Sequence, residues 1–237
     1  MAIGRLEPEL FAQVLATRTE DHDPISSLCL ATTDVLGVSG AGLVLMSKGR
    51  SLACVGVSDA ATEVIEQLAY TLGEGPCVAA YKKKAPVFDP DLGDVKTERW
   101  PEFRRGAIAA GMRAAFGFPL LVDTVCIGAL NLYHTRPGAL TDRQVCDALV
   151  VADIAGRTLL RWQADAPPGT VAWQLEEVPK HGIEVHQASG RISVQASVSL
   201  ADAVVLLRAY AFANDRPIGD IAHEVASGAL RFDGPDQ

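Results

Sequence analysis

Cys77 is the residue of this chain whose surroundings best suit covalent chemistry. It ends the loop 73–77 (GEGPC), and the residues that follow it, VAAYKKK, favour a short helix. A cysteine at a helix N-terminus is favoured as the thiolate, which is the nucleophilic form. A tight turn that delivers a small buried residue explains the same loop, and we favour this simpler interpretation.

The other residues that could act in catalysis show no catalytic arrangement. Asp89 and Asp91 follow an apolar run, as a phosphoacceptor does, but the further acidic pair and the parallel sheet of a phospho-receiver are not visible. The sequence also lacks a P-loop, GxSxG, HExxH and a dinucleotide fingerprint. Its five histidines lack the spacing of metal ligands. We therefore expect a protein that is not an enzyme, with no metal and no cofactor.

A glycine inside a predicted helix draws attention to the C-terminal part of the chain. Gly190 lies within HQASGRISVQ (186–195), where glycine costs about 1 kcal/mol relative to alanine. Two interpretations stay open: the bare helix face admits a ligand, or it allows close packing against another helix. Nearby side chains suit RNA loops, whose unpaired bases stack and form hydrogen bonds. These side chains belong to Gln187, Arg191, Arg208, Tyr210 and Arg216.

A DNA-binding helix-turn-helix formed by the last two predicted helices is less favourable. Its recognition helix would lie in the major groove, yet it carries Asp220 and Glu224 before one arginine, Arg231. Carboxylates are poor partners for a groove lined by phosphates. Residues 183–232 contain four arginines, no lysine and five acidic residues, so a tail that does not bind RNA is an alternative.

The first two thirds of the chain alternate between helical and strand periodicity. Helices are predicted at 4–20, 25–37, 60–72, 98–110 and 141–162, with a short one after residue 77; strands are predicted at 41–47, 51–58, 85–92, 114–122 and 126–135. Two hairpins with helices before and after them indicate an α+β fold with a mostly antiparallel sheet. A capping box formed by Thr141 and Gln144 opens the last helix, whose inward positions are predicted as Val145, Leu149, Ala152 and Leu159.

Proline and glycine in ADAPPGT (164–170) mark a break, after which only helices are predicted. The first spans about 180–197 and the second begins after Ser199, with an apolar stripe of Leu200, Ala203, Leu207 and Ala211. The third begins at Pro217 and ends near Leu230. We divide the chain into an α+β domain (1–163), a linker (164–179) and an all-α domain of three helices (180–237).

The composition of the chain argues against several classes of protein. The net charge of −8 argues against sequence-independent binding to nucleic acid or anionic membranes. No apolar run approaches the roughly 20 residues of a membrane span, and the N-terminus lacks the features of a signal peptide. Five scattered cysteines fit reduced thiols. We expect a cytoplasmic protein.

The C-terminal part closely resembles the ANTAR domain, a three-helix RNA-binding module of transcription antiterminators. The resemblance lies in HQASGRISVQASVSLADAVVLLRAYAFANDRPIGDIAHEVA: an A-x-G on the first helix, Val198-Ser199 before the second, Leu207-Arg208 within it, and the N-D-R-P turn. It implies that the chain binds paired RNA hairpin loops and acts in antitermination. The implied RNA-binding residues are Gln187, Ser189, Gly190, Arg191, Arg208, Tyr210 and Arg216.

The preceding part resembles the GAF domains that are fused to ANTAR domains in actinobacterial regulators. The resemblance lies in LGEGPCVAAYKKKAPVFDPDL, RWPEF, FPLLV and IGALNLYHTRPGALTDRQ. It implies a sensor with a central antiparallel sheet, which binds a small molecule or mediates dimerisation. Candidate ligand-pocket residues are Phe88, Trp100, Phe103, Phe116, Phe118 and Tyr133. Because the helices at 4–20 and 141–162 each have an apolar face, we expect a homodimer.

Overall fold

A computed structural model describes residues 24–47, 50–165, 181–214 and 216–232. The chain divides into two compact units, unit 1 (Met1–Glu177) and unit 2 (Val178–Gln237), which are treated separately below. No helix among the described residues is long and apolar enough to cross a membrane.

Unit 1 is built on an antiparallel sheet, as the two predicted hairpins indicate. Its described strands are β1 (Gly40–Ser47), β2 (Arg50–Val57), β3 (Val87–Asp89), β4 (Ala114–Val122) and β5 (Val125–His134). They lie in the order β2-β1-β5-β4-β3, and each neighbouring pair is antiparallel. The hairpin β4–β5 turns at Asp123, whose φ of 54° is left-handed. β5 is therefore the central strand, with β1 and β4 as its hydrogen-bonded neighbours.

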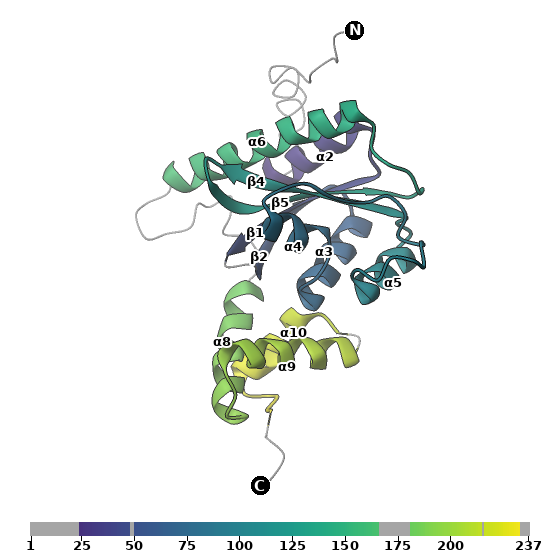
Figure 1. Cartoon of the computed structure of the whole chain (residues 1–237). Coiled ribbons are helices and arrows are strands. Elements are labelled where there is room, and N and C mark those ends of the chain that lie inside the picture. The colour runs from purple at the N-terminus through teal and green to yellow at the C-terminus, as the bar shows by residue number, and fades with distance from the viewer. Residues whose placement is uncertain (1–23, 48–49, 166–180, 215, 233–237) are drawn as a thin grey trace. The chain divides into compact units, whose positions relative to one another are not determined.

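Helices cover both faces of this sheet (Figure 1). On one face lie α2 (Pro24–Leu36) and α6 (Asp142–Asp165), which contact each other. On the other face lie α3 (Ala60–Leu72), α4 (Pro76–Lys83) and α5 (Pro101–Ala109). An apolar cluster that includes Ile65, Phe103 and Ala129 lies beneath α3, α4 and α5.

Local signals fix where the helices of unit 1 begin and end. The side chain of Asp59 accepts a hydrogen bond from the Thr62 amide at 2.9 Å, which caps α3, and Gly73 ends that helix at a left-handed φ of 67°. The capping box of α6 is confirmed: the Gln144 amide donates to Thr141 Oγ1 at 3.2 Å, and the Thr141 amide donates to Gln144 Oε1 at 2.9 Å. Such caps satisfy amides that a helix end leaves unpaired.

Unit 2 contains three helices within its described residues: α8 (His181–Gln195), α9 (Leu200–Ala213) and α10 (Ile218–Ser227). Their shared core consists of small and branched apolar side chains, among them Ala188, Ile192, Ala203, Leu207, Ala211, Ile221, Ala222 and Val225. Ser199 caps α9 as the sequence predicts, because its Oγ accepts from the Asp202 amide and donates to the Asp202 carboxylate at 2.6 Å.

Several predicted details are wrong. Leu149 and Leu200 were expected to face inward but are 44% and 59% exposed. In α6 Ala152 and Leu159 are buried as predicted, whereas Ala148 is buried in place of Leu149. α10 ends at Ser227, not near Leu230, because Gly228 adopts a left-handed φ of 85° and closes the helix.

Other predicted elements cannot be compared with the structure. The helix at 4–20 and the turn residues 48–49 lie outside the described residues. α6 continues to Asp165, into the predicted linker, and residues 166–179 of that linker also lie outside the described residues.

Candidate nucleic-acid interface

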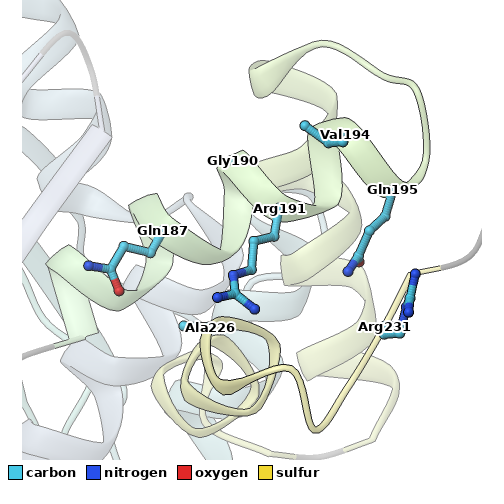
Figure 2. A pocket seen from close by; sticks show the side chains of 7 residues that line it. All are labelled: Gln187, Gly190, Arg191, Val194, Gln195, Ala226 and Arg231. Atoms are coloured by element: carbon cyan, nitrogen blue, oxygen red, sulfur yellow. The ribbon is translucent and has the colours of Figure 1, made fainter.

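A hollow of about 760 Å³ lies in unit 2, between α8, α10 and the segment that follows α10. Figure 2 shows the side chains of Gln187, Arg191 and Gln195 extending from α8 on the side where Ala226 and Arg231 lie. The lining residues are Gln187, Gly190, Arg191, Val194, Gln195, Ala226 and Arg231. The polar groups among its described lining residues are amides and guanidinium groups, which offer hydrogen-bond donors and positive charge.

Helical spacing explains why α8 presents these residues together. Residues 187, 190, 191 and 194 are separated by three or four positions, which places them on one face of a helix. The opposite face carries Ala188 and Ile192, which are fully buried in the core of unit 2. The prediction that Gln187 and Arg191 lie on one exposed face of the helix is thus confirmed.

Gly190 is not required by the packing of unit 2. A Cβ built at this position would have no neighbouring atom within 4 Å, apart from its own helix and adjoining residues. Its φ is not left-handed either, unlike that of Gly228. The close-packing interpretation of this glycine is therefore wrong, since an alanine would fit in its place. What remains is a stretch of bare helical backbone that faces the hollow.

Arg191 presents an uncommitted positive charge beside this glycine. Its side chain is exposed, and no residue that the structure describes forms a hydrogen bond or an ion pair with it. Its Nη1 lies 3.6 Å from the position that a Cβ on Gly228 would occupy. A guanidinium group in this position can donate hydrogen bonds to phosphate or base edges and can stack on a base.

The segment after α10 forms the second wall of the hollow and is fixed by two contacts. The Phe232 amide donates to Gln195 Oε1 at 3.0 Å, which ties the segment to α8. The ring of Phe232 packs edge-on against Tyr210, with 5.2 Å between ring centroids. These contacts hold Arg231 at the hollow, across from Arg191 (Figure 2).

The remaining residues predicted to contact RNA do not line the hollow. Ser189 is 2% exposed, and its hydroxyl donates to the Val185 carbonyl at 2.6 Å. Arg216 forms a two-point ion pair with Glu224, at 2.6 and 3.2 Å. This pairing raises the pKa of Arg216 and lowers that of Glu224. Arg208 is half-buried on α9, and Tyr210 packs against Phe232.

Four lining residues were not predicted from the sequence: Val194, Gln195, Ala226 and Arg231. The helical period could have identified Val194, which lies four positions after Gly190. Arg231 could not be found in this way, because its place depends on the contacts that Phe232 makes with another helix.

The six aromatic residues predicted to line a pocket in unit 1 are divided between the two faces of the sheet. The ring of Phe88 contacts those of Phe116 and Phe118, with centroids 6.0 and 5.6 Å away. Tyr133 lies on the opposite face, where its hydroxyl reaches α3, and Trp100 packs against Phe103 near α5. Because strand side chains alternate between faces, these residues do not line a single cavity.

A buried polar cluster lies beneath α3 instead. Both carboxylate oxygens of Glu66 accept hydrogen bonds from Asn131 Nδ2, at 2.9 and 3.0 Å, and the Tyr133 hydroxyl donates to Oε1 at 2.9 Å. Burial raises the pKa of Glu66 from 4.5 to about 7, although both donors act in the opposite direction. The sequence analysis did not identify Glu66 or Asn131.

The residues considered for covalent chemistry, Cys77 and Asp89, are buried in the fold. Cys77 is fully buried, and burial raises the pKa of its thiol to about 12, so the favoured interpretation of its loop is confirmed. Asp89 is buried against Arg104, which also donates to the carbonyls of Asp91 and Asp94 at 2.9 and 2.8 Å. The described residues contain no cluster of three or more potential metal ligands.

Comparisons with known proteins identify unit 1. The model of the GAF domain family matches residues 20–157, which is more than half of the chain, and the match does not extend into unit 2. Comparison with curated protein sequences finds no match.

Several solved structures resemble this part of the chain. A domain described as part of a two-component sensor histidine kinase of Sinorhizobium meliloti 1021 is 20% identical, with 68% of this chain and 96% of that chain covered and a TM-score of 0.43. The GAF domain of an Acinetobacter phosphoenolpyruvate-protein phosphotransferase is 12% identical, with coverages of 66% and 92% and a TM-score of 0.49. Free methionine-R-sulfoxide reductase of Neisseria meningitidis is 17% identical, with coverages of 63% and 85% and a TM-score of 0.43.

Proposed function

The chain belongs to the GAF domain family, and we propose that it is a regulator in which the GAF unit controls RNA binding by unit 2. In this proposal unit 2 is an ANTAR-like module that binds paired RNA hairpin loops and acts in transcription antitermination. The chain itself is not an enzyme and uses no cofactor. The GAF unit senses a small molecule and contributes to a homodimer.

The open face around Gly190 carries the RNA-binding part of this proposal. A mid-helix glycine costs about 1 kcal/mol relative to alanine, and neither packing nor backbone conformation requires it here. A ligand that approaches the helix backbone closely does require it, because a methyl group would occupy the contact. Gly190 is therefore best explained by a binding partner in the hollow.

The chemistry of the hollow favours an RNA loop over a DNA duplex. Arg191 and Arg231 can neutralise phosphates or stack on bases, while Gln187 and Gln195 can read base edges. α10 presents the exposed carboxylate of Asp220, which opposes its insertion into a phosphate-lined groove. A splayed loop needs only local contacts of the kind that the hollow provides.

Binding of the full chain to a labelled RNA with two tandem six-base hairpin loops tests this function. A scrambled-loop RNA and a DNA duplex serve as ligand controls at the same salt concentration. We expect binding that depends on the loop sequence. Equal affinity for all three ligands, or none at micromolar protein with and without metabolite pools, would contradict the proposal.

Charge-matched variants locate the site. We expect Arg191→Gln to weaken loop binding by about fivefold or more, since a hydrogen bond from a charged group contributes more than about 1 kcal/mol. Arg161→Gln is the control, because Arg161 is also an exposed helical arginine but belongs to α6 of unit 1. If both variants bind RNA like the parent chain, the hollow is not the RNA site.

A second function is favoured by the charges of unit 2. Residues 183–232 carry five acidic residues against four arginines, and Arg216 is already paired with Glu224. These features suit a small-molecule-binding or scaffold dimer whose ANTAR-like tail does not bind RNA. A ligand-dependent change in unit 1 without any RNA binding would support this alternative.

A further inference from the structure

Glu66 is an enclosed carboxyl group whose hydrogen-bond donors, Asn131 and Tyr133, are both neutral groups. It is 2% exposed, and its hydrogen-bond donors Asn131 and Tyr133 are fully buried. Asn131 Oδ1 is also buried, and no residue in the described part of the chain forms a hydrogen bond with it. When Glu66 is ionised, the Asn131 amide nitrogen and the Tyr133 hydroxyl both donate to its carboxylate, and Asn131 Oδ1 is left without a donor among the residues that the structure describes.

The described residues around Glu66 supply no compensating charge. The ionisable groups that act on it are Cys54 on β2, Cys77 on α4 and Tyr133 on β5, and burial raises the pKa of each of them, so all three are neutral near pH 7. β1 brings the uncharged Gly42 against the Glu66 side chain. A buried carboxylate without a cation is costly, whereas the neutral acid is not.

Protonation would also satisfy the unpartnered oxygen. A carboxylate can only accept hydrogen bonds, but a carboxylic acid has one O–H donor. After a small rotation of the Asn131 amide, this O–H can donate to Oδ1 while the amide nitrogen still donates to the other carboxyl oxygen. Proton uptake by Glu66 therefore supplies the hydrogen bond that Asn131 Oδ1 lacks.

The cluster also determines how closely α3 approaches the sheet. Glu66 and Thr62 of α3 occupy the space that Cβ atoms on Gly42 and Gly40 would fill. α3 is consequently in direct contact with the backbone of β1, and Glu66 joins it to β5. A change in the charge of Glu66 acts at the contact between this helix and the centre of the sheet.

We propose that Glu66, Asn131 and Tyr133 form a proton-operated switch in unit 1, in which proton uptake holds α3 against β1 and β5 and proton loss releases it. The pKa of Glu66 is about 7 in the closed state and near its ordinary value of 4.5 once the group is exposed. The closed state thus binds the proton more tightly, so acidification between these two values favours it. Opening of α3 should increase as the pH rises and level off above about 7. This inference does not depend on RNA binding by unit 2.

Hydrogen exchange of the α3 amides in the full chain tests the switch. After correction for intrinsic exchange, the opening equilibrium should rise by up to tenfold per pH unit between pH 5.5 and about 7, because one proton is released on opening. The variant Glu66→Gln keeps a neutral side chain of similar size and should show no such rise. Equal pH dependence in both proteins would overturn the proposal.

The protonation state can be observed independently of folding. Difference infrared spectra of the parent chain should show a carboxylic-acid band that disappears with a midpoint near pH 7 and is missing in Glu66→Gln. Tyr133→Phe removes one donor to the carboxylate and should shift this midpoint to higher pH. A midpoint that is unchanged in Tyr133→Phe, or the same spectrum from Glu66→Gln, would contradict the switch.

Discussion

Gly190 allows stability and binding to be separated at a single residue. We expect Gly190→Ala to stabilise α8 by about 1 kcal/mol, because the site has room for a methyl group and alanine is the better helix former. The same methyl group would project into the hollow and weaken RNA binding by about fivefold or more, as overpacking costs about 1–3 kcal/mol. Denaturant unfolding and RNA titration of the same preparation check both effects.

Arg161→Gln again serves as the control for Gly190→Ala. It should leave both the free energy of unfolding and the RNA affinity close to those of the parent chain. A Gly190→Ala protein that is more stable and binds RNA like the parent chain would show that no ligand contacts this part of α8. A less stable protein would show that the glycine has a packing role after all.

The sequence correctly predicted the roles of side chains whose partners lie at the start of the same helix. Thr141 with Gln144 and Ser199 with Asp202 were identified because capping depends on residues three positions apart. It failed where a residue depends on distant contacts. Ser189 was assigned to RNA although it points into the helix bundle, and Glu66 was missed because its partners lie 65 and 67 positions away.

At the scale of elements, the first turn of α9 is closed by the side chain of Ser199. Ser199→Ala removes the acceptor for the Asp202 amide and should cost about 1 kcal/mol. The loss should be seen as faster hydrogen exchange in the first turn of α9. Ser227→Ala is the matched control, since that hydroxyl donates to the Glu224 carbonyl at the end of α10 and caps no N-terminus.

If Ser227→Ala and Ser199→Ala affect exchange in α9 equally, the capping role of Ser199 is wrong. The comparison holds because both serines are exposed residues of unit 2 that lie at helix ends.

Most element bounds were predictable, and the exceptions have identifiable causes. α3 was predicted at 60–72 and is observed there, since Asp59 and Gly73 mark both ends. Leu149 and Leu200 were assigned to the core because apolar type alone suggests burial. Ala203 of the predicted α9 stripe is buried as expected, but in α6 the smaller Ala148 is buried in place of Leu149. A composition rule does not favour alanine over leucine for the core.

At the scale of the whole molecule, we expect two chains to associate through α6. Leu149 and Leu160 on this helix are 44% and 39% exposed. Leu149→Asp with Leu160→Asp should therefore convert the dimer to a monomer in sedimentation equilibrium, because a charge at an apolar contact is costly. Val95→Asp is the control, since Val95 is 95% exposed on a loop of the same unit.

The same monomeric variant should lose the advantage of paired hairpins. A dimer with two hollows can bind both loops of one RNA, which raises the overall affinity without a new contact. Parent chain and Val95→Asp should then prefer the two-loop RNA over a single loop by about tenfold or more, and the double variant should not. A parent chain that sediments as a monomer would contradict the dimer and this expectation together.

The close contact of α3 with Gly40 and Gly42 of β1 has an evolutionary consequence. Since Glu66 occupies the volume that a side chain at Gly42 would need, neither position can change freely while the other stays as it is. Lineages that retain the carboxyl group should keep glycine at the facing position. Only those that first acquire a short side chain in place of Glu66 become free to fill the sheet, and they would give up the proton-binding group as they do so.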